Sequence, residues 1–135
     1  MRVLLVCAIA SATILSPRYC EPQSLQQLVT RIGPSTILVE QKEISVVRVL
    51  AGHVFVLGTG APASGVTVDL CNSGWKTVLA STKTDERGYF SLGNQEAGKL
   101  LYVRLSSPGM DIYRLRVCIK KHAAHELRIR LSVAT

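Results

Sequence analysis

Few side chains in this sequence have a type and spacing that suits chemistry. His122 and His125 lie three residues apart, directly after Lys120 and Lys121. Two histidines at that spacing could bind one metal ion from a helix, but the surrounding pattern predicts a loop between strands. The two lysines would also repel a cation. We therefore predict no metal site and no cofactor, and expect these histidines to be solvated.

Recognisable catalytic arrangements are also missing from the sequence. No serine lies in a nucleophile-elbow pattern, and no cysteine is paired with a histidine in a way that would support nucleophilic catalysis. Asp69, Asp85 and Glu86 are acidic, but a calcium site needs a denser set of oxygen ligands, so we expect them to cap turns. The sequence predicts that the chain is not an enzyme.

The aromatic residues offer a candidate for ligand contact. Trp75 is the single tryptophan and lies in a predicted turn beside Lys76, and Tyr89 follows the next turn. An exposed tryptophan can stack on a sugar ring or anchor a protein interface. It can equally fold back over the end of the domain, and the residues alone leave both interpretations open.

The positive charge offers a second candidate. The formal net charge is +7, and four arginines alternate with apolar residues in two predicted strands, namely Arg114, Arg116, Arg128 and Arg130. Such a basic face could meet an anionic polymer, a lipid surface or an acidic partner. A solvated sheet face is the other interpretation. We do not expect nucleic acid to be the partner.

The N-terminus is typical of a secretory signal peptide over residues 1–16. Arg2 precedes an apolar run at residues 3–15, which contains small residues at positions 10–12. The run is shorter than the roughly 20 residues needed to span a bilayer. Cleavage after Ala12 or Ser16 would fit equally well. We expect a secreted or periplasmic mature chain without a membrane span.

Export permits disulfide bonds. Loss of the leader would leave Cys20, Cys71 and Cys118. By strand alternation Cys71 and Cys118 both point outward, and such a pair can bridge only if its strands are neighbours in one sheet. A Cys71–Cys118 disulfide is therefore a possible pairing.

The elements that would position these residues are mainly strands. Residues 17–43 are predicted to form a linker with a short helix at 24–32, where apolar residues recur at helical spacing between Ser24 and Gly33. A short strand is expected at 36–39. From 44 to 135, apolar and polar residues alternate, and turn signals recur about every ten residues, which is typical of an all-β sandwich.

Several motifs within residues 49–133 resemble the carboxypeptidase regulatory-like domain. They are LAGHV at 50–54, GVTVDL at 65–70, TKTDERGYFSL at 82–92, and the segment 103–109. In the third motif, Gly88 suits a tight turn, Asp85 can accept turn amides, and Phe90 can anchor the core.

The resemblance implies a fold and a general role. The fold is a seven-stranded, Greek-key-type β-sandwich of the transthyretin-like (prealbumin-like) kind, grouped with carbohydrate-binding-like folds. The role is a non-catalytic accessory module of the kind common in exported bacterial proteins.

Three functions follow as expectations. The first is an exported, non-catalytic accessory or binding module that contacts a protein or cell-surface partner. The second is a carbohydrate-binding protein that uses loop aromatics such as Trp75, which rests on analogy of fold. The third is a small hydrolase of the transthyretin-like kind, although the histidines and arginines that it would need are not assembled in the sequence.

Overall fold

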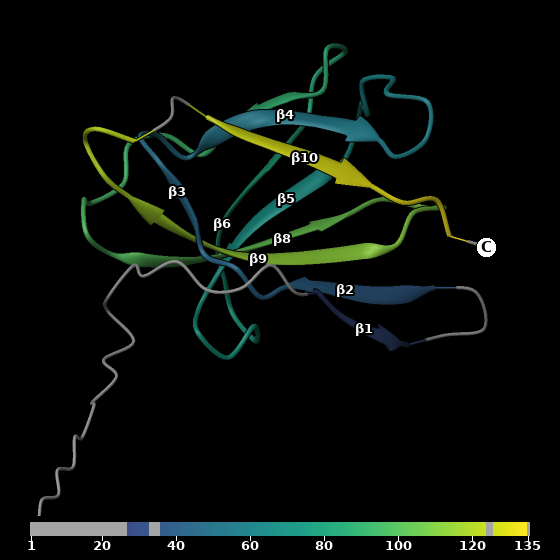
Figure 1. Ribbon diagram of the computed structural model, residues 1–135, viewed down its shortest axis with the longest axis horizontal. Coiled ribbons are helices and arrows are strands. Elements are labelled where there is room, and N and C mark those ends of the chain that lie inside the picture. The colour runs from purple at the N-terminus through teal and green to yellow at the C-terminus, as the bar shows by residue number, and fades with distance from the viewer. Residues whose placement is uncertain (1–26, 33–35, 124–125, 135) are drawn as a thin grey trace, which may run out of the picture.

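The computed structural model describes residues 27–32, 36–123 and 126–134, which form ten strands and no helix (Figure 1). The strands are β1 (Gln27–Arg31), β2 (Ile37–Gln41), β3 (Ser45–Val47), β4 (Ala51–Val56), β5 (Thr67–Cys71), β6 (Val78–Lys83), β7 (Tyr89–Ser91), β8 (Leu100–Ser106), β9 (Ile112–Ile119) and β10 (Leu127–Leu131).

The strands form two sheets. The large sheet has the order β1-β2-β9-β8-β5-β6, with β3 also paired to β9, and the small sheet has the order β10-β4-β7. Pairing is antiparallel except for β10 with β4 and for β2 and β3 with β9, which are parallel. Figure 1 shows β4 and β10 lying together across from β5, β8 and β9. The predicted all-β sandwich is confirmed.

The core lies between the two sheets. Alternate residues of β8 and β10 are buried, as the period of two along a strand requires, and β5 is buried on both faces over residues 68–71. Val68, Val103 and Val117 enter the core from the large sheet, while Val54 and Ile129 enter it from the small one. The aliphatic composition thus fills a single core.

The turn before Phe90 connects β6 of the large sheet to β7 of the small sheet, and Phe90 itself enters the core between them. The side chain of Phe90 is only 1% exposed, which confirms its predicted role as a core anchor. Asp85 Oδ1 accepts the backbone N–H groups of Arg87 and Tyr89 at 2.9 and 3.0 Å. Gly88 has φ 78°, and a Cβ atom there would lie 2.4 Å from the carbonyl oxygen of Val54. The predicted turn chemistry is confirmed.

The predicted helix at residues 24–32 is wrong in its described part. Residues 27–31 form β1, an antiparallel partner of β2, and residues 24–26 lie outside the described residues. All five residues of β1 are exposed, so an amphipathic helix would have had no surface on which to bury its apolar side. Pairing with β2 satisfies the backbone instead.

Two further expectations concern the same region. The seven strands expected at residues 44–135 are not confirmed as a count, because β3 to β10 lie in that range. The short strand expected at 36–39 corresponds to β2. Since β1 and β2 extend the large sheet, the sheets include residues before Ile44. The predicted signal peptide lies outside the described residues. Within those residues, no helix has the length and apolar character needed to cross a membrane.

Candidate functional site

Trp75 lies in the turn that joins β5 to β6. Asn72 Oδ1 accepts the backbone N–H groups of Lys76 and Thr77 at 3.0 and 3.2 Å, and this closes the turn. Trp75 itself has φ 61°, the left-handed conformation that side-chain-bearing residues rarely adopt. The turn carries the indole ring back toward the outer face of the large sheet.

The ring of Trp75 already has partners on that face. It meets Tyr102 edge-on, with ring centroids 5.5 Å apart, and the guanidinium carbon of Arg114 lies 4.8 Å from its centroid. The ring therefore packs on the outer face of the large sheet, not over the end of the domain, and it is half-buried there. A sugar stacking on Trp75 would have to compete with these contacts.

A polar network surrounds this ring. Asp69 Oδ2 and Oδ1 accept hydrogen bonds from Arg104 and from Ser81 Oγ, at 3.1 and 2.7 Å. Arg104 also donates to the backbone carbonyl of Trp75 at 3.4 Å. Arg114 forms an ion pair with Glu40 at 2.9 Å. The positive charge on this face is therefore largely paired.

Tyr89 lies on the other sheet, so the structure does not bring it together with Trp75. We call its surroundings the small-sheet face, which consists of His53, Phe55, Tyr89, Arg128 and Arg130. The strand register places Arg128, His53 and Tyr89 in one row across three strands, and Arg130 and Phe55 in the next row. This face points away from the core, because the residues that alternate with it are buried.

The side chains of the small-sheet face contact one another. The His53 ring lies 5.2 Å from that of Tyr89 and 6.2 Å from that of Phe55. The guanidinium carbon of Arg128 lies 5.8 Å from the Phe55 centroid. Tyr89 is 37% exposed, and Arg128 and Arg130 are exposed. The result is an accessible surface of rings bordered by arginines.

One carboxylate adjoins the small-sheet face directly. Glu126 Oε1 lies 2.6 Å from His53 Nδ1. In the turn before Tyr89, the backbone N–H groups of Tyr89 and Arg87 lower the pKa of Asp85. Both acids lie at the border of the face, while Arg128 and Arg130 are its exposed cations.

The predicted basic face does not exist as one surface. Arg114 and Arg116 project from β9 in the large sheet, whereas Arg128 and Arg130 project from β10 in the small sheet (Figure 1). Both pairs alternate with buried residues and point outward, but from opposite layers of the sandwich. The prediction of a single face is wrong. Alternation predicts on which side of its strand a side chain lies, but it does not predict which sheet the strand joins.

The predicted Cys71–Cys118 disulfide is also wrong. Cys71 is a free, buried thiol, and Cys118 is disulfide-bonded. β8 lies between their strands, β5 and β9. Two strand spacings amount to about 10 Å, beyond the roughly 7 Å that a disulfide can bridge. Burial raises the pKa of the Cys71 thiol, which disfavours the reactive thiolate.

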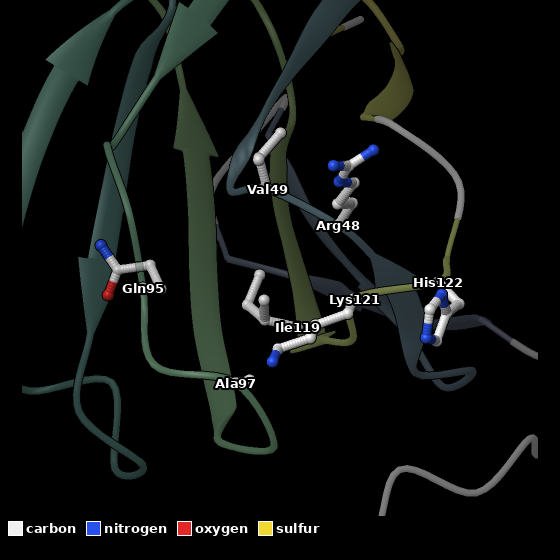
Figure 2. Close-up of a pocket in the computed structure, with 7 residues that line it drawn as sticks. All are labelled: Arg48, Val49, Gln95, Ala97, Ile119, Lys121 and His122. Atoms are coloured by element: carbon white, nitrogen blue, oxygen red, sulfur yellow. The ribbon is translucent and has the colours of Figure 1, made fainter.

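A pocket of about 530 Å³ lies at one end of the sandwich (Figure 2). We call it the end pocket. It is formed by the bend after β3, the connection between β7 and β8, and the end of β9. Its lining comprises Arg48, Lys121 and His122, the amide of Gln95, and the apolar side chains of Val49, Ala97 and Ile119.

Backbone hydrogen bonds hold the segments of the end pocket together. Lys120 N–H donates to the Val47 carbonyl and Gly98 N–H donates to the Ile119 carbonyl, each at 2.9 Å. Gln95 Nε2 donates to the Leu92 carbonyl at 3.0 Å, which shapes the loop. These bonds set the backbone around the pocket, and the side chains of Arg48, Lys121 and His122 reach it from exposed positions.

Sequence reasoning missed the end pocket. It treated His122 only as a possible partner of His125, which lies outside the described residues, and nothing connected either histidine with Arg48. The only local signal was the basic run at 120–122. Within the part of the chain that the structure describes, no group of three or more histidines, cysteines and acidic residues is placed to hold a metal ion.

Comparisons with known proteins give a limited picture. No protein-family model matches the sequence, and no curated protein matches it. The structure is similar to that of the 5-hydroxyisourate hydrolase of Klebsiella pneumoniae, with 20% sequence identity and a TM-score of 0.48, over 65% of this chain and 92% of that chain. No matching model supports the carboxypeptidase regulatory-like resemblance.

The same comparison corrects one expectation. The prediction that the chain is not an enzyme rested partly on its resemblance to a non-catalytic module. A similar structure that belongs to a hydrolase overturns that ground, so the fold does not exclude catalysis. At this TM-score the likeness carries no argument for any particular reaction. The architecture of the chain is that of a two-sheet β-sandwich.

Proposed function

We propose that the chain is an exported binding module that contacts a protein or cell-surface partner through the small-sheet face. The observation that carries this proposal is the row of Arg128, His53 and Tyr89 across three paired strands. Export rests on the signal-peptide pattern of residues 1–16.

The chemistry of the small-sheet face suits binding. Tyrosine and arginine are the side chains most often found among the residues that dominate binding energy at protein interfaces. The His53 ring, within this row, stacks with Phe55 of the next row, and this contact reduces the side-chain freedom that binding would have to remove. By contrast, Arg114 is engaged with Glu40 and Trp75.

A glycan is the alternative ligand. The exposed ring of Tyr89 is better suited to stack on a sugar than Trp75, whose ring contacts Arg114 and Tyr102. The proposal therefore moves the candidate aromatic contact from the β5–β6 turn to the small sheet.

Binding of the labelled chain without residues 1–16 to envelope preparations of the producing cells tests the proposal. We expect Tyr89→Ala and the double variant Arg128→Gln/Arg130→Gln each to weaken binding by about tenfold or more, equivalent to 1.4 kcal/mol. The matched control is Lys76→Gln/Lys83→Gln, which removes the same charge from exposed positions associated with the large sheet.

Two treatments separate the classes of partner. Protease digestion of the envelope should abolish binding to a protein, and glycosidase digestion should abolish binding to a glycan. Urea unfolding of each variant shows whether the fold is intact. Wild-type affinity in both folded small-sheet variants would overturn the proposal.

A further inference from the structure

We propose that the end pocket binds a sugar-sized anion that carries more than one acid group, such as a sulfated or phosphorylated sugar. This site lies outside the small-sheet face, and the proposal does not depend on the function assigned to that face.

The charge of the end pocket favours an anion. Arg48 and Lys121 are cations at neutral pH, and the His122 ring can donate a hydrogen bond. No carboxylate belongs to the described residues that line this pocket. The nearest acid in sequence is Glu96, which lines an adjoining hollow together with Lys99. Glu96 and Lys99 offset each other, so the excess positive charge of the end pocket remains.

The placement of the cations favours a ligand with several acid groups. Figure 2 shows Arg48, Lys121 and His122 spread around the end pocket, and they do not converge on one point. A single small ion would therefore contact one of them at a time. A ligand that carries acid groups on different sides could engage two or three together.

The size and floor of the end pocket favour a sugar. Its volume of about 530 Å³ lies within the usual range for small-molecule sites, roughly 300–1,000 Å³. Val49 and Ile119 provide apolar surface, against which the carbon-bearing face of a sugar ring can pack. The Gln95 side chain also lines the pocket, and its amide oxygen could accept a hydrogen bond from a hydroxyl group.

Calorimetric titration of the chain without residues 1–16 tests the inference, with sucrose octasulfate as the probe and sucrose as its neutral counterpart. At about 50 mM salt, where charge screening is weak, we expect binding of the octasulfate and none of sucrose. Arg48→Gln/Lys121→Gln should weaken octasulfate binding by about tenfold or more. Lys76→Gln/Lys83→Gln and Arg128→Gln/Arg130→Gln remove the same charge elsewhere and should change it less than about twofold.

Amide chemical-shift mapping with sucrose octasulfate provides a second measurement that needs no variant. Shifts should cluster at residues 48–49, 95–97 and 119–122. Lack of octasulfate binding by the wild-type chain would overturn the inference, as would equal losses in the three double variants, or shifts centred on the small-sheet face. Inorganic sulfate that bound as tightly as the octasulfate would also overturn it, since it would indicate a single-ion site.

The outcomes keep the two proposals apart. Failure of the octasulfate test would leave envelope binding through Arg128 and Arg130 unaffected. Loss of envelope binding only in Arg48→Gln/Lys121→Gln would support the end pocket and contradict the small-sheet face.

Discussion

Trp75 and Tyr89 show how contacts decide the role of a residue. The sequence made both of them candidates for ligand contact because each lies at a turn. In the fold, the Trp75 ring packs between Tyr102 and Arg114, while Tyr89 lies on an accessible face of the other sheet. Tyr89 is therefore the aromatic residue that we propose as a binding residue.

Asp85 should make stability depend on pH in acid. Its pKa in the folded state is below the ordinary value of 3.8, because the folded turn supplies two N–H donors to the ionised form. The folded state thus binds fewer protons than the unfolded state in this range, so this contribution is present above pH 3.8 and is lost as the pH falls through the lowered pKa.

The variant Asp85→Asn tests this pH dependence. The amide oxygen can still accept the turn N–H groups, so the fold should be retained, but the acid-sensitive contribution should disappear. Urea midpoints measured from about pH 6 to pH 2 should fall less steeply for the variant than for the wild type. Glu86→Gln removes the same charge one residue away and is the control. Parallel curves for Asp85→Asn and wild type would contradict the expectation.

The cysteines should differ sharply in reactivity. Peptide mapping without reduction should find Cys118 in a disulfide and Cys71 as a free thiol. Because Cys71 is buried and its pKa is raised, iodoacetamide should modify it slowly in the folded chain and quickly in urea. Rapid labelling of native Cys71 would refute the assignment.

At the scale of elements, the turn before β7 depends on Gly88. Gly88→Ala would place a methyl group 2.4 Å from the Val54 carbonyl oxygen, which accepts a hydrogen bond from Ala63. This clash adds to the cost of a positive φ at alanine. We therefore expect Gly88→Ala to lower the free energy of unfolding by about 3 kcal/mol or more.

Gly93→Ala is the matched control for this substitution. Gly93 also has a positive φ, of 80°, but a Cβ atom there would have no neighbour within 4 Å. Gly93→Ala should therefore lower the free energy of unfolding by only about 1–2 kcal/mol. Urea unfolding measures both values. Equal losses would show that close approach to β4 is not the reason for glycine at position 88.

The hairpin of β1 and β2 shows the limit of local patterns. The apolar residues at 25–32 fit helical spacing, but Val29 and Thr30 are β-branched and also suit a strand. A helix of two turns is marginal on its own, so the available partner decides the outcome. That partner is β2, which is itself fixed by its parallel pairing with β9.

At the scale of the whole molecule, stability should be graded from the centre of the large sheet to its edge. β8 and β9 are interior strands with fully buried residues such as Val103 and Val117. β1 is an edge strand in which every residue is exposed. Amide hydrogen exchange should be slowest in β8 and β9, and faster by orders of magnitude in β1. Comparable protection of Val29 and Val117 would contradict this gradient.

The sequence by itself determined the features that local chemistry controls. Alternation of apolar and polar residues predicted the sandwich, and Asp85, Gly88 and Phe90 predicted the turn and its core anchor, because a period of two and a positive φ are properties of neighbouring residues. Only the tertiary structure decided which sheet each strand joins. That choice separates Arg114 from Arg128 and Trp75 from Tyr89, while the order of strands within the large sheet separates Cys71 from Cys118. The same fold brings Arg48 and Lys121 to one pocket. Strand pairing between distant segments sets these neighbours, and no local pattern records it.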